Sequence, residues 1–148
     1  MRQSTLAAVA DFLNATGWNY SVFMQIYEAS TSLGKDTERL IVSALGNEVR
    51  ISDVKSVTVD NVLVEIRSGL TYPGTDGAGP DRSALATPQF AELLQSVLSE
   101  ASELARSASK IEQCCIEEGH PAYPVFWDFA FLFTLPMTVL LLVGSSSD

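Results

Sequence analysis

The sequence predicts an α+β fold in which an antiparallel sheet is covered by one long and one short helix. Three observations support this prediction: apolar residues alternate over 18–72, a long helical pattern spans 88–118, and two short apolar runs lie within 129–143. Sheets and helices with one apolar face each are stable when they bury those faces against each other. With 148 residues, of which 47% are apolar, the chain is expected to form a single domain over 1–148.

The first segment is expected to be a short helix over residues 4–16. Ser4 is a suitable N-cap, and Gly17 can end the helix. Leu6, Val9 and Leu13 form an apolar stripe between these two residues. The stripe is expected to pack on one face of the sheet.

Residues 18–72 are expected to form a β meander, because the hydrophobic period changes to two. The Gly-Asn pair at 46–47 and the Asp-Asn pair at 60–61 supply turn residues, which indicates antiparallel order. The stretch 48–59 is long for one strand, and a bend or bulge is expected at 52–53. The alternating runs are found at 22–26, 40–42, 49–51 and 62–66.

A flexible loop rich in glycine and proline is expected at 71–87, before the clearest helix signal in the chain. Thr87 is a suitable N-cap, Pro88 suits the first helical position, and Gly119 marks the end. Between them apolar residues follow one another at alternating steps of four and three residues, which makes an a/d seam. A helix is therefore predicted over 88–118.

Residues 124–144 have two interpretations, a buried hairpin of two strands or a membrane segment. The stretch 129–147 has no charged residue, but its strongly apolar part is shorter than the roughly 20 residues that a spanning helix needs. It is also interrupted by Thr134-Leu135-Pro136 and has no Lys or Arg anchor at either side. We therefore expect a hairpin that turns at 135–136 in the middle of the sheet, and we do not expect a membrane anchor.

The charge of the chain restricts its partners. There are 9 basic and 18 acidic residues, a net charge of -9 with histidine neutral. Residues 71–148 contain 10 of the acidic residues and 3 of the basic ones. Such a field repels polyanions, so neither nucleic acid nor an anionic membrane surface is an expected partner. It attracts a basic protein partner.

The cysteines and the start of the chain favour a reducing compartment. Cys114 and Cys115 are neighbours on the predicted long helix, where successive side chains point about 100° apart and cannot form a disulfide. The first residues alternate small and apolar side chains and are broken by Asp11, unlike the uninterrupted apolar stretch of a secretory signal. We therefore expect a cytoplasmic protein.

The sequence contains no pattern typical of a catalytic or metal centre. His120 is the only histidine, and it stands beside Pro121, as turn residues often do. With Cys114 and Cys115 it lacks a fourth ligand and the spacing of zinc sites. The glycine-rich loop lacks the Gly-Lys-Ser/Thr ending of a phosphate loop. We therefore expect a protein that is not an enzyme and that has no cofactor and no metal site.

Binding residues are expected among the carboxylates and aromatic residues of the second half. Glutamates would steer a basic partner, and an aromatic residue would anchor it. Asp128 is unusual because it interrupts an aromatic run, where a carboxylate must face water or find a donor. The predicted partner-binding residues are Glu100, Glu103, Glu112, Glu117, Glu118, Tyr123, Trp127 and Asp128.

These features predict a small acidic binding protein, such as an inhibitor, an immunity factor or a chaperone for a basic protein. In composition and element order, though in no motif, the chain is similar to type III secretion chaperones, and the same outline suits small immunity or antitoxin proteins. A second hypothesis is a homo-oligomeric structural or assembly protein, such as a homodimer. It would pair through the seam of the helix 88–118, at Leu94, Val97 and Leu104.

Overall fold

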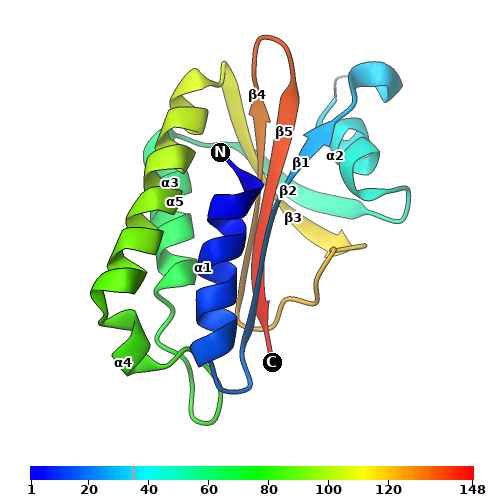
Figure 1. Cartoon of the computed structure of the whole chain (residues 1–148). Coiled ribbons are helices and arrows are strands. Elements are labelled where there is room, and N and C mark those ends of the chain that lie inside the picture. The colour runs from blue at the N-terminus through cyan, green and yellow to red at the C-terminus, as the bar shows by residue number, and fades with distance from the viewer. Residues whose placement is uncertain (35) are drawn as a thin grey trace.

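The computed structural model describes residues 1–34 and 36–148, apart from the side chain of Leu33, and confirms the α+β prediction. A five-stranded antiparallel sheet in the order β1-β5-β4-β3-β2 carries helices on both faces (Figure 1). The strands are β1 (Ser21–Ala29), β2 (Arg50–Ser56), β3 (Lys110–Glu118), β4 (Trp127–Thr134) and β5 (Val139–Ser147). The helices are α1 (Gln3–Thr16), η1 (Thr31–Leu33, a 3-10 helix), α2 (Thr37–Leu45), α3 (Val59–Leu70), α4 (Arg82–Leu85) and α5 (Pro88–Ser107).

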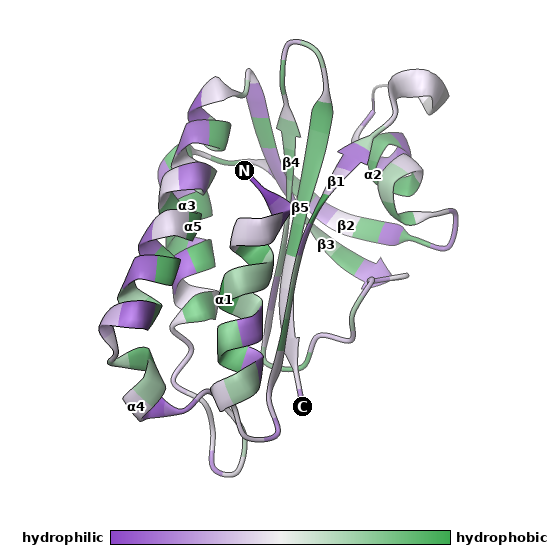
Figure 2. Ribbon diagram, in the orientation of Figure 1, coloured by the Kyte–Doolittle hydropathy of each residue, from purple (hydrophilic) through white to green (hydrophobic). Residues whose placement is uncertain are grey.

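Two hydrophobic cores lie on opposite faces of the sheet. Helices α1, α3 and α5 cover one face, and the short α2 covers part of the other (Figure 1). Phe131 and Phe133 of β4 belong to the core beneath the three helices, whereas Leu132 faces the α2 side with Ile41 and Leu141. Figure 2 shows hydrophobic residues gathered on the central strands β4 and β5. Both strands therefore bury side chains on two faces.

The prediction of a C-terminal hairpin is confirmed. Strands β4 and β5 pair in register from Trp127 with Ser146 to Thr134 with Val139. At the turn, the Leu135 amide donates to the Thr138 carbonyl over 2.9 Å. Both strands lie inside the sheet rather than at its edges. Among the described residues, no helix combines the length and the apolar character that crossing a bilayer requires.

The predicted β meander is only half right. The runs at 22–26 and 49–51 belong to strands β1 and β2, but those at 40–42 and 62–66 lie in helices α2 and α3. The sheet partners of β1 and β2 are β5 and β3, so the two strands lie at opposite edges of the sheet. Alternation over so few residues also fits one face of a helix, because positions four apart satisfy both periods.

Local capping chemistry explains why α2 and α3 are helical. The Asp36 side chain accepts from the Arg39 amide over 3.0 Å, which caps α2. Thr58 and Asn61 form a reciprocal capping box at the start of α3. The Asp-Asn pair at 60–61 therefore lies in the first turn of a helix and not in a hairpin turn.

The predicted bulge in β2 is confirmed. The pairing of β2 with β3 shifts register between Ser52 and Lys55. Asp53 lies in this interval with φ of 51°, a left-handed conformation that aspartate tolerates better than most residues. The bulge and the charges of Asp53 and Lys55 make this edge a poor template for another strand.

The opposite edge of the sheet is closed by side-chain amides of α1. Gln3 donates to the Met24 carbonyl over 3.1 Å and accepts from the Ile26 amide over 3.0 Å. Asn14 bonds both the amide and the carbonyl of Val22. These carboxamides supply the donors and acceptors that a neighbouring strand would otherwise supply.

The long helix begins where the sequence predicts but ends earlier. Thr87 caps α5 by accepting from the Phe90 amide over 3.2 Å, and Pro88 occupies the first position. The helix ends at Ser107 instead of residue 118, and residues 110–118 form strand β3. The apolar steps continue across this boundary by coincidence, because pairing with β4 decides the structure of the later residues.

Candidate protein interface

The residues predicted to bind a partner do not form one surface. Glu100 and Glu103 lie on α5, in the helical layer. The other six lie on β3, on the connection 119–126 or at the start of β4. The two groups therefore lie on different elements of the fold.

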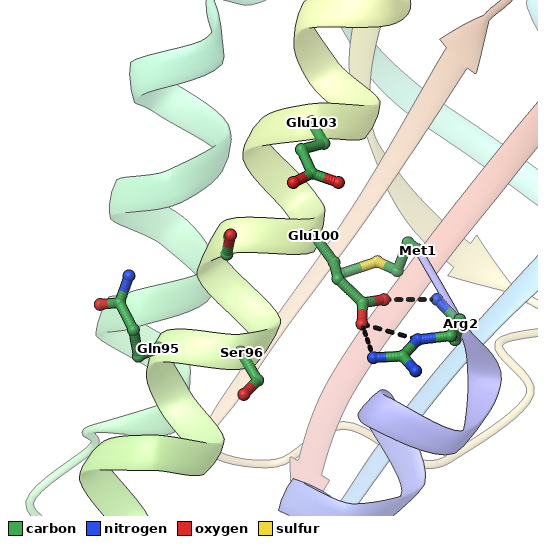
Figure 3. A pocket seen from close by; sticks show the side chains of 7 residues that line it. Met1, Arg2, Gln95, Ser96, Glu100 and Glu103 are labelled. Carbon is green, nitrogen blue, oxygen red and sulfur yellow. Dashed lines mark hydrogen bonds and ion pairs between the residues drawn. The ribbon is translucent and has the colours of Figure 1, made fainter.

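Glu100 is used inside the chain, where it fastens the start of α1 to α5 (Figure 3). Its carboxylate accepts from the Arg2 amide at 2.7 Å, from Arg2 Nε and Nη2 at 2.9 and 2.6 Å, and from Thr5 Oγ1 at 2.8 Å. Burial by itself raises the pKa of Glu100. The hydrogen bonds and the positive charge of Arg2, together with the hydrogen bond from the Thr5 hydroxyl, outweigh this effect and lower the pKa to about 2. Because α1 has no acidic residue in its first turn, Glu100 supplies the negative charge there.

Glu103 is exposed on α5 and borders a shallow depression of about 650 Å³ beside this ion pair (Figure 3). The rest of the lining is mainly amide, hydroxyl and ion-pair groups, with Met1 as the apolar exception. Hot spots of protein interfaces are enriched in Trp, Tyr and Arg, and the Arg2 side chain here is already paired. This depression therefore lacks the side chains that are typical of an interface hot spot.

The three glutamates of β3 differ in their availability. Glu112 is buried, and its carboxylate accepts from Thr37 Oγ1 over 3.0 Å and pairs with Lys110 over 2.8 Å, which links α2 to β3. Glu118 forms an ion pair with Arg50 of β2. Glu117 is exposed. Glu112 therefore stabilises the fold. Of the three carboxylates, that of Glu117 is the most available to a partner.

A cluster of aromatic rings lies where β1 begins and the 119–126 connection enters β4. Tyr20, Tyr72 and Phe126 contact one another with ring centroids 5.6 to 6.2 Å apart. Trp127 joins them by donating from Nε1 to the Tyr20 hydroxyl over 2.8 Å. Burial raises the pKa of Tyr20, so this hydroxyl stays protonated. Three separate segments are thus joined in one rigid base.

Trp127 is placed by a close approach to α3. A Cβ added at Gly69 would lie 2.9 Å from Trp127 Cε3, so only glycine allows the indole this position. The Trp127 side chain is half-buried, and Asp128, the next residue, is exposed on the opposite face of the sheet. The sequence prediction joined these two residues in one site, but the strand separates their side chains.

Trp18 is a candidate that sequence analysis missed. It is 74% exposed, although its backbone is fixed by two hydrogen bonds with Gly79, of 2.9 and 3.0 Å. Asn19 reaches the same loop by donating to the Gly77 carbonyl over 3.2 Å. The loop expected at 71–87 is therefore attached to the start of β1, and part of it forms helix α4. Its flexibility stays a prediction.

Tyr123 is the second large aromatic residue held in solvent. It is 81% exposed, and Val125 beside it is also exposed. The Val125 and Phe126 amides both donate to the Ser146 carbonyl, at 2.8 and 3.3 Å, which fastens this connection to β5. Trp18 and Tyr123 thus lie on two segments that adjoin the same aromatic cluster.

We call this surface the aromatic end, and it is small enough for one partner to cover. Trp18 is two residues from Tyr20 and Tyr123 is three from Phe126, so the Cα of each exposed residue is at most about 10 Å from that of its neighbour in the base. A standard interface buries about 800 Å² on each partner, roughly 30 Å across. The aromatic end consists of Trp18, Tyr20, Tyr72, Tyr123, Phe126 and Trp127.

Acidic residues outnumber basic residues in the chain segments that adjoin the aromatic end, although Arg50 of β2 already pairs with Glu118. The segments 17–21, 71–82, 117–128 and 145–148 contain six carboxylates and one guanidinium, that of Arg82. In Figure 1 the first, second and fourth of these segments lie at the end of the sheet where the C-terminus is found, and the third leads back to it. The field there favours a cationic partner.

The cysteines lie on strand β3 rather than on a helix. Cys114 is buried and Cys115 is exposed, because successive strand residues point to opposite faces. Burial, with the negative charges nearby, raises the pKa of Cys114 to about 12. Within the described residues, no group of three or more histidine, cysteine or carboxylate side chains is arranged to hold a metal ion.

Comparisons of the chain with protein-family models, with curated proteins and with solved structures find no significant match.

Proposed function

We propose that this protein is a non-enzymatic binding protein that engages a basic protein partner through the aromatic end. It would act as an inhibitor, an immunity factor or a chaperone, in the cytoplasm. The observation that carries the proposal is the exposure of two large aromatic side chains, Trp18 at 74% and Tyr123 at 81%, on segments that adjoin one aromatic cluster. Large aromatic residues held in water are typical anchors of protein interfaces.

The chemistry of these side chains supports a cationic partner. Lysine and arginine stack favourably on tryptophan and tyrosine rings, and the contact strengthens when the surroundings exclude water. Carboxylates at Asp76, Asp128 and Asp148 would speed the approach of a basic protein. Binding energy would come mainly from the rings, and partner choice and association rate from the carboxylates.

Pairing through the seam of the long helix receives no support from the structure. Leu94, Val97 and Leu104 are buried within the chain, in the core beneath α1, α3 and α5. A homo-oligomer would therefore need a different surface, or the core would have to open. We keep the basic partner as the proposed function.

The proposal is tested by affinity capture from the native cell extract with matched variants. We expect the wild-type protein to enrich a basic protein at low salt and to release it at high salt. The Trp18→Ala/Tyr123→Ala double variant should capture at least tenfold less, about 1.4 kcal/mol of binding free energy. Far-ultraviolet circular dichroism confirms that the double variant is folded.

The matched control is Met137→Ala, which removes a side chain 95% exposed at the tip of the β4–β5 hairpin. This tip lies at the opposite end of the sheet from the C-terminus (Figure 1). Capture by the Met137→Ala variant should equal that of the wild type. Equal capture by the double variant and the wild type would refute the proposed interface.

A further inference from the structure

The loop 71–87 contains a pair of neighbours, Asp76 and Gly77, that can react with each other. No other aspartate or asparagine in the chain is followed by glycine. An aspartate closes a five-membered ring when the next amide nitrogen attacks its side-chain carbonyl carbon. A side chain on the following residue hinders this attack, and glycine has none. Asp76 is therefore the aspartate in this chain at which the ring closes most easily.

The structure leaves both reacting groups accessible. Asp76 and Gly77 are exposed, in a turn that two backbone bonds between Thr75 and Ala78 close, at 2.7 and 3.4 Å. Within the described part of the chain, neither the Asp76 carboxylate nor the Gly77 amide has a hydrogen-bond partner or an ion pair. Beyond its chain neighbours, no atom lies within 4 Å of the place that a Cβ would take at Gly77. The reacting pair therefore has open space around it.

The remaining aspartates are less suited to this reaction. Asp81 accepts from the hydroxyl and the amide of Ser83, both over 2.8 Å, and these bonds lower the pKa of Asp81. The protonated carboxyl group is the form that closes the ring, because its hydroxyl leaves as water, so a lower pKa reduces the reactive fraction. The other aspartates lie in or cap a helix, lie in a strand or end the chain: Asp11, Asp36, Asp53, Asp60, Asp128 and Asp148.

We propose that Asp76 is a modification site, which isomerises spontaneously to isoaspartate and thereby loosens the attachment of Trp18. The Gly77 nitrogen forms a bond to Asp76 Cγ, and the carboxyl hydroxyl leaves with the amide proton as water. Water then adds to one carbonyl of this cyclic imide and breaks its bond to nitrogen. Breakage at Cγ restores aspartate, whereas breakage at the backbone carbon gives isoaspartate. One water is lost and one is gained, and nothing is oxidised or reduced.

The modified residue would lie beside the bonds that hold Trp18. The Gly77 carbonyl accepts from Asn19 over 3.2 Å, and Gly79 exchanges two backbone bonds with Trp18, of 2.9 and 3.0 Å. Isoaspartate adds one methylene group to the backbone of the turn, which then no longer has the geometry of a two-residue turn. The loop has little room for this change, since a Cβ at Gly79 would lie 2.5 Å from Gly74 Cα. The bonds between Gly79 and Trp18 are therefore expected to weaken.

The experiment follows the full-length protein during prolonged incubation at neutral pH in water enriched in oxygen-18. Trypsin cleaves after Arg67 and Arg82, so Asp76 and Asp81 are found on the same peptide, 68–82. Mass spectrometry with electron-based fragmentation locates isoaspartate and the heavy oxygen that each ring opening adds. We expect isoaspartate to accumulate at Asp76 at least about tenfold faster than at Asp81, a barrier difference of about 1.4 kcal/mol.

Two variants and a free peptide serve as controls. Asp76→Glu keeps the carboxylate but would need a six-membered ring, so it should form no detectable isomer. Asp81→Glu should leave the rate at Asp76 unchanged. A synthetic peptide of residues 68–82 reports the reactivity of the unfolded segment. Equal rates at Asp76 and Asp81, or a peptide that isomerises while the folded protein does not, would overturn the proposal.

Hydrogen exchange of the isolated isoaspartate form tests the loosening. The Trp18 and Gly79 amides should exchange faster than in the unmodified protein. The Leu135 amide, which bonds the Thr138 carbonyl in the β4–β5 turn, should not change. Unchanged exchange at Trp18 and Gly79 would show that the modification does not loosen this attachment.

The consequence for partner binding rests on the proposed function, because it assumes that Trp18 is an anchor. We expect the isoaspartate form to capture less of the basic partner than the unmodified protein does. Equal capture by both forms would contradict a role of the modification in binding. The chemical and exchange measurements need no partner, so a protein that captures nothing and still isomerises at Asp76 would count against the proposed function alone.

Discussion

Replacing Gly144 by alanine is expected to destabilise the protein by about 3 kcal/mol, the upper range for overpacking a core. Gly144 of β5 faces Phe129 of β4 in the sheet register. A Cβ at this position would lie 2.3 Å from Phe129 Cζ and 2.7 Å from Cε2. The Phe129 ring covers the glycine, as aromatic residues do opposite glycines in designed sheets.

The Phe129 ring has no free space into which to move. It is buried between Trp127 and Phe131, with ring centroids 5.8 and 5.4 Å away. A shift of Phe129 would therefore disturb Trp127 and the base of the aromatic end. Urea unfolding of the Gly144→Ala variant measures the loss, and Ser147→Ala on the same strand is the control, with an expected change within about 0.5 kcal/mol. Equal stability of the two variants would contradict the packing described here.

Glu100→Gln is expected to lower the free energy of unfolding by about 2 kcal/mol at neutral pH, the range for hydrogen bonds to charged groups. The Glu100 side chain is 15% exposed, so solvent screens its ion pair with Arg2 only in part. Glutamine keeps the shape but loses the charge that three donor groups of Arg2 contact. The start of α1 would be held less firmly to α5.

The effect of Glu100→Gln should depend on pH in a defined direction. The carboxyl pKa is about 2 in the folded protein against 4.5 as the ordinary value, so its stabilising contribution is complete above 4.5. It decreases below 4.5 and is lost as the pH falls through about 2. Unfolding curves of wild type and variant should therefore differ by a constant amount at neutral pH and converge in acid.

Glu103→Gln is the matched control for Glu100→Gln. Glu103 lies on the same helix, three residues later, and its side chain is exposed. Surface substitutions of this kind change stability by less than about 0.5 kcal/mol. If Glu103→Gln were as destabilising as Glu100→Gln, general charge repulsion rather than the contact with Arg2 would explain the effect.

The parts of the fold that the sequence predicts correctly have strong local signals. Thr87 and Pro88 start α5, and the apolar runs on either side of Pro136 form the central hairpin. The incorrectly predicted parts are short apolar runs whose spacing fits both the two-residue period of a strand and the 3.6-residue period of a helix. Val62 and Ile66 are two positions of an alternating run and also one turn of α3, and the Thr58–Asn61 capping box selects the helix.

The end of α5 is not predictable from its seam. Ile111 and Cys115 continue the helical spacing, but they lie on β3, opposite β4 or β2. The choice depends on a partner strand that follows later in the chain, which local sequence does not contain. The same reasoning applies to Glu112. It would be exposed on the outer face of a helix, but it is buried on strand β3.

The candidate interface is only partly predictable. Tyr123 and Trp127 are found as aromatic residues near an apolar hairpin, and both belong to the aromatic end. Trp18 was missed because hydrophobic periodicity does not distinguish an exposed tryptophan from a buried one. The contact that holds it, with Gly79, joins segments about 60 residues apart, and periodicity does not report such contacts.

Hydrogen exchange of the complex with the captured basic protein tests the central claim most directly. Amides in 17–20, 73–80 and 119–126 should gain protection when the partner binds, while the exposed positions of α5 from Glu92 to Glu103 should exchange at the same rate as in the free protein. Protection of α5 without any change at Trp18 or Tyr123 would show that the partner uses the helical layer and would contradict the proposed interface.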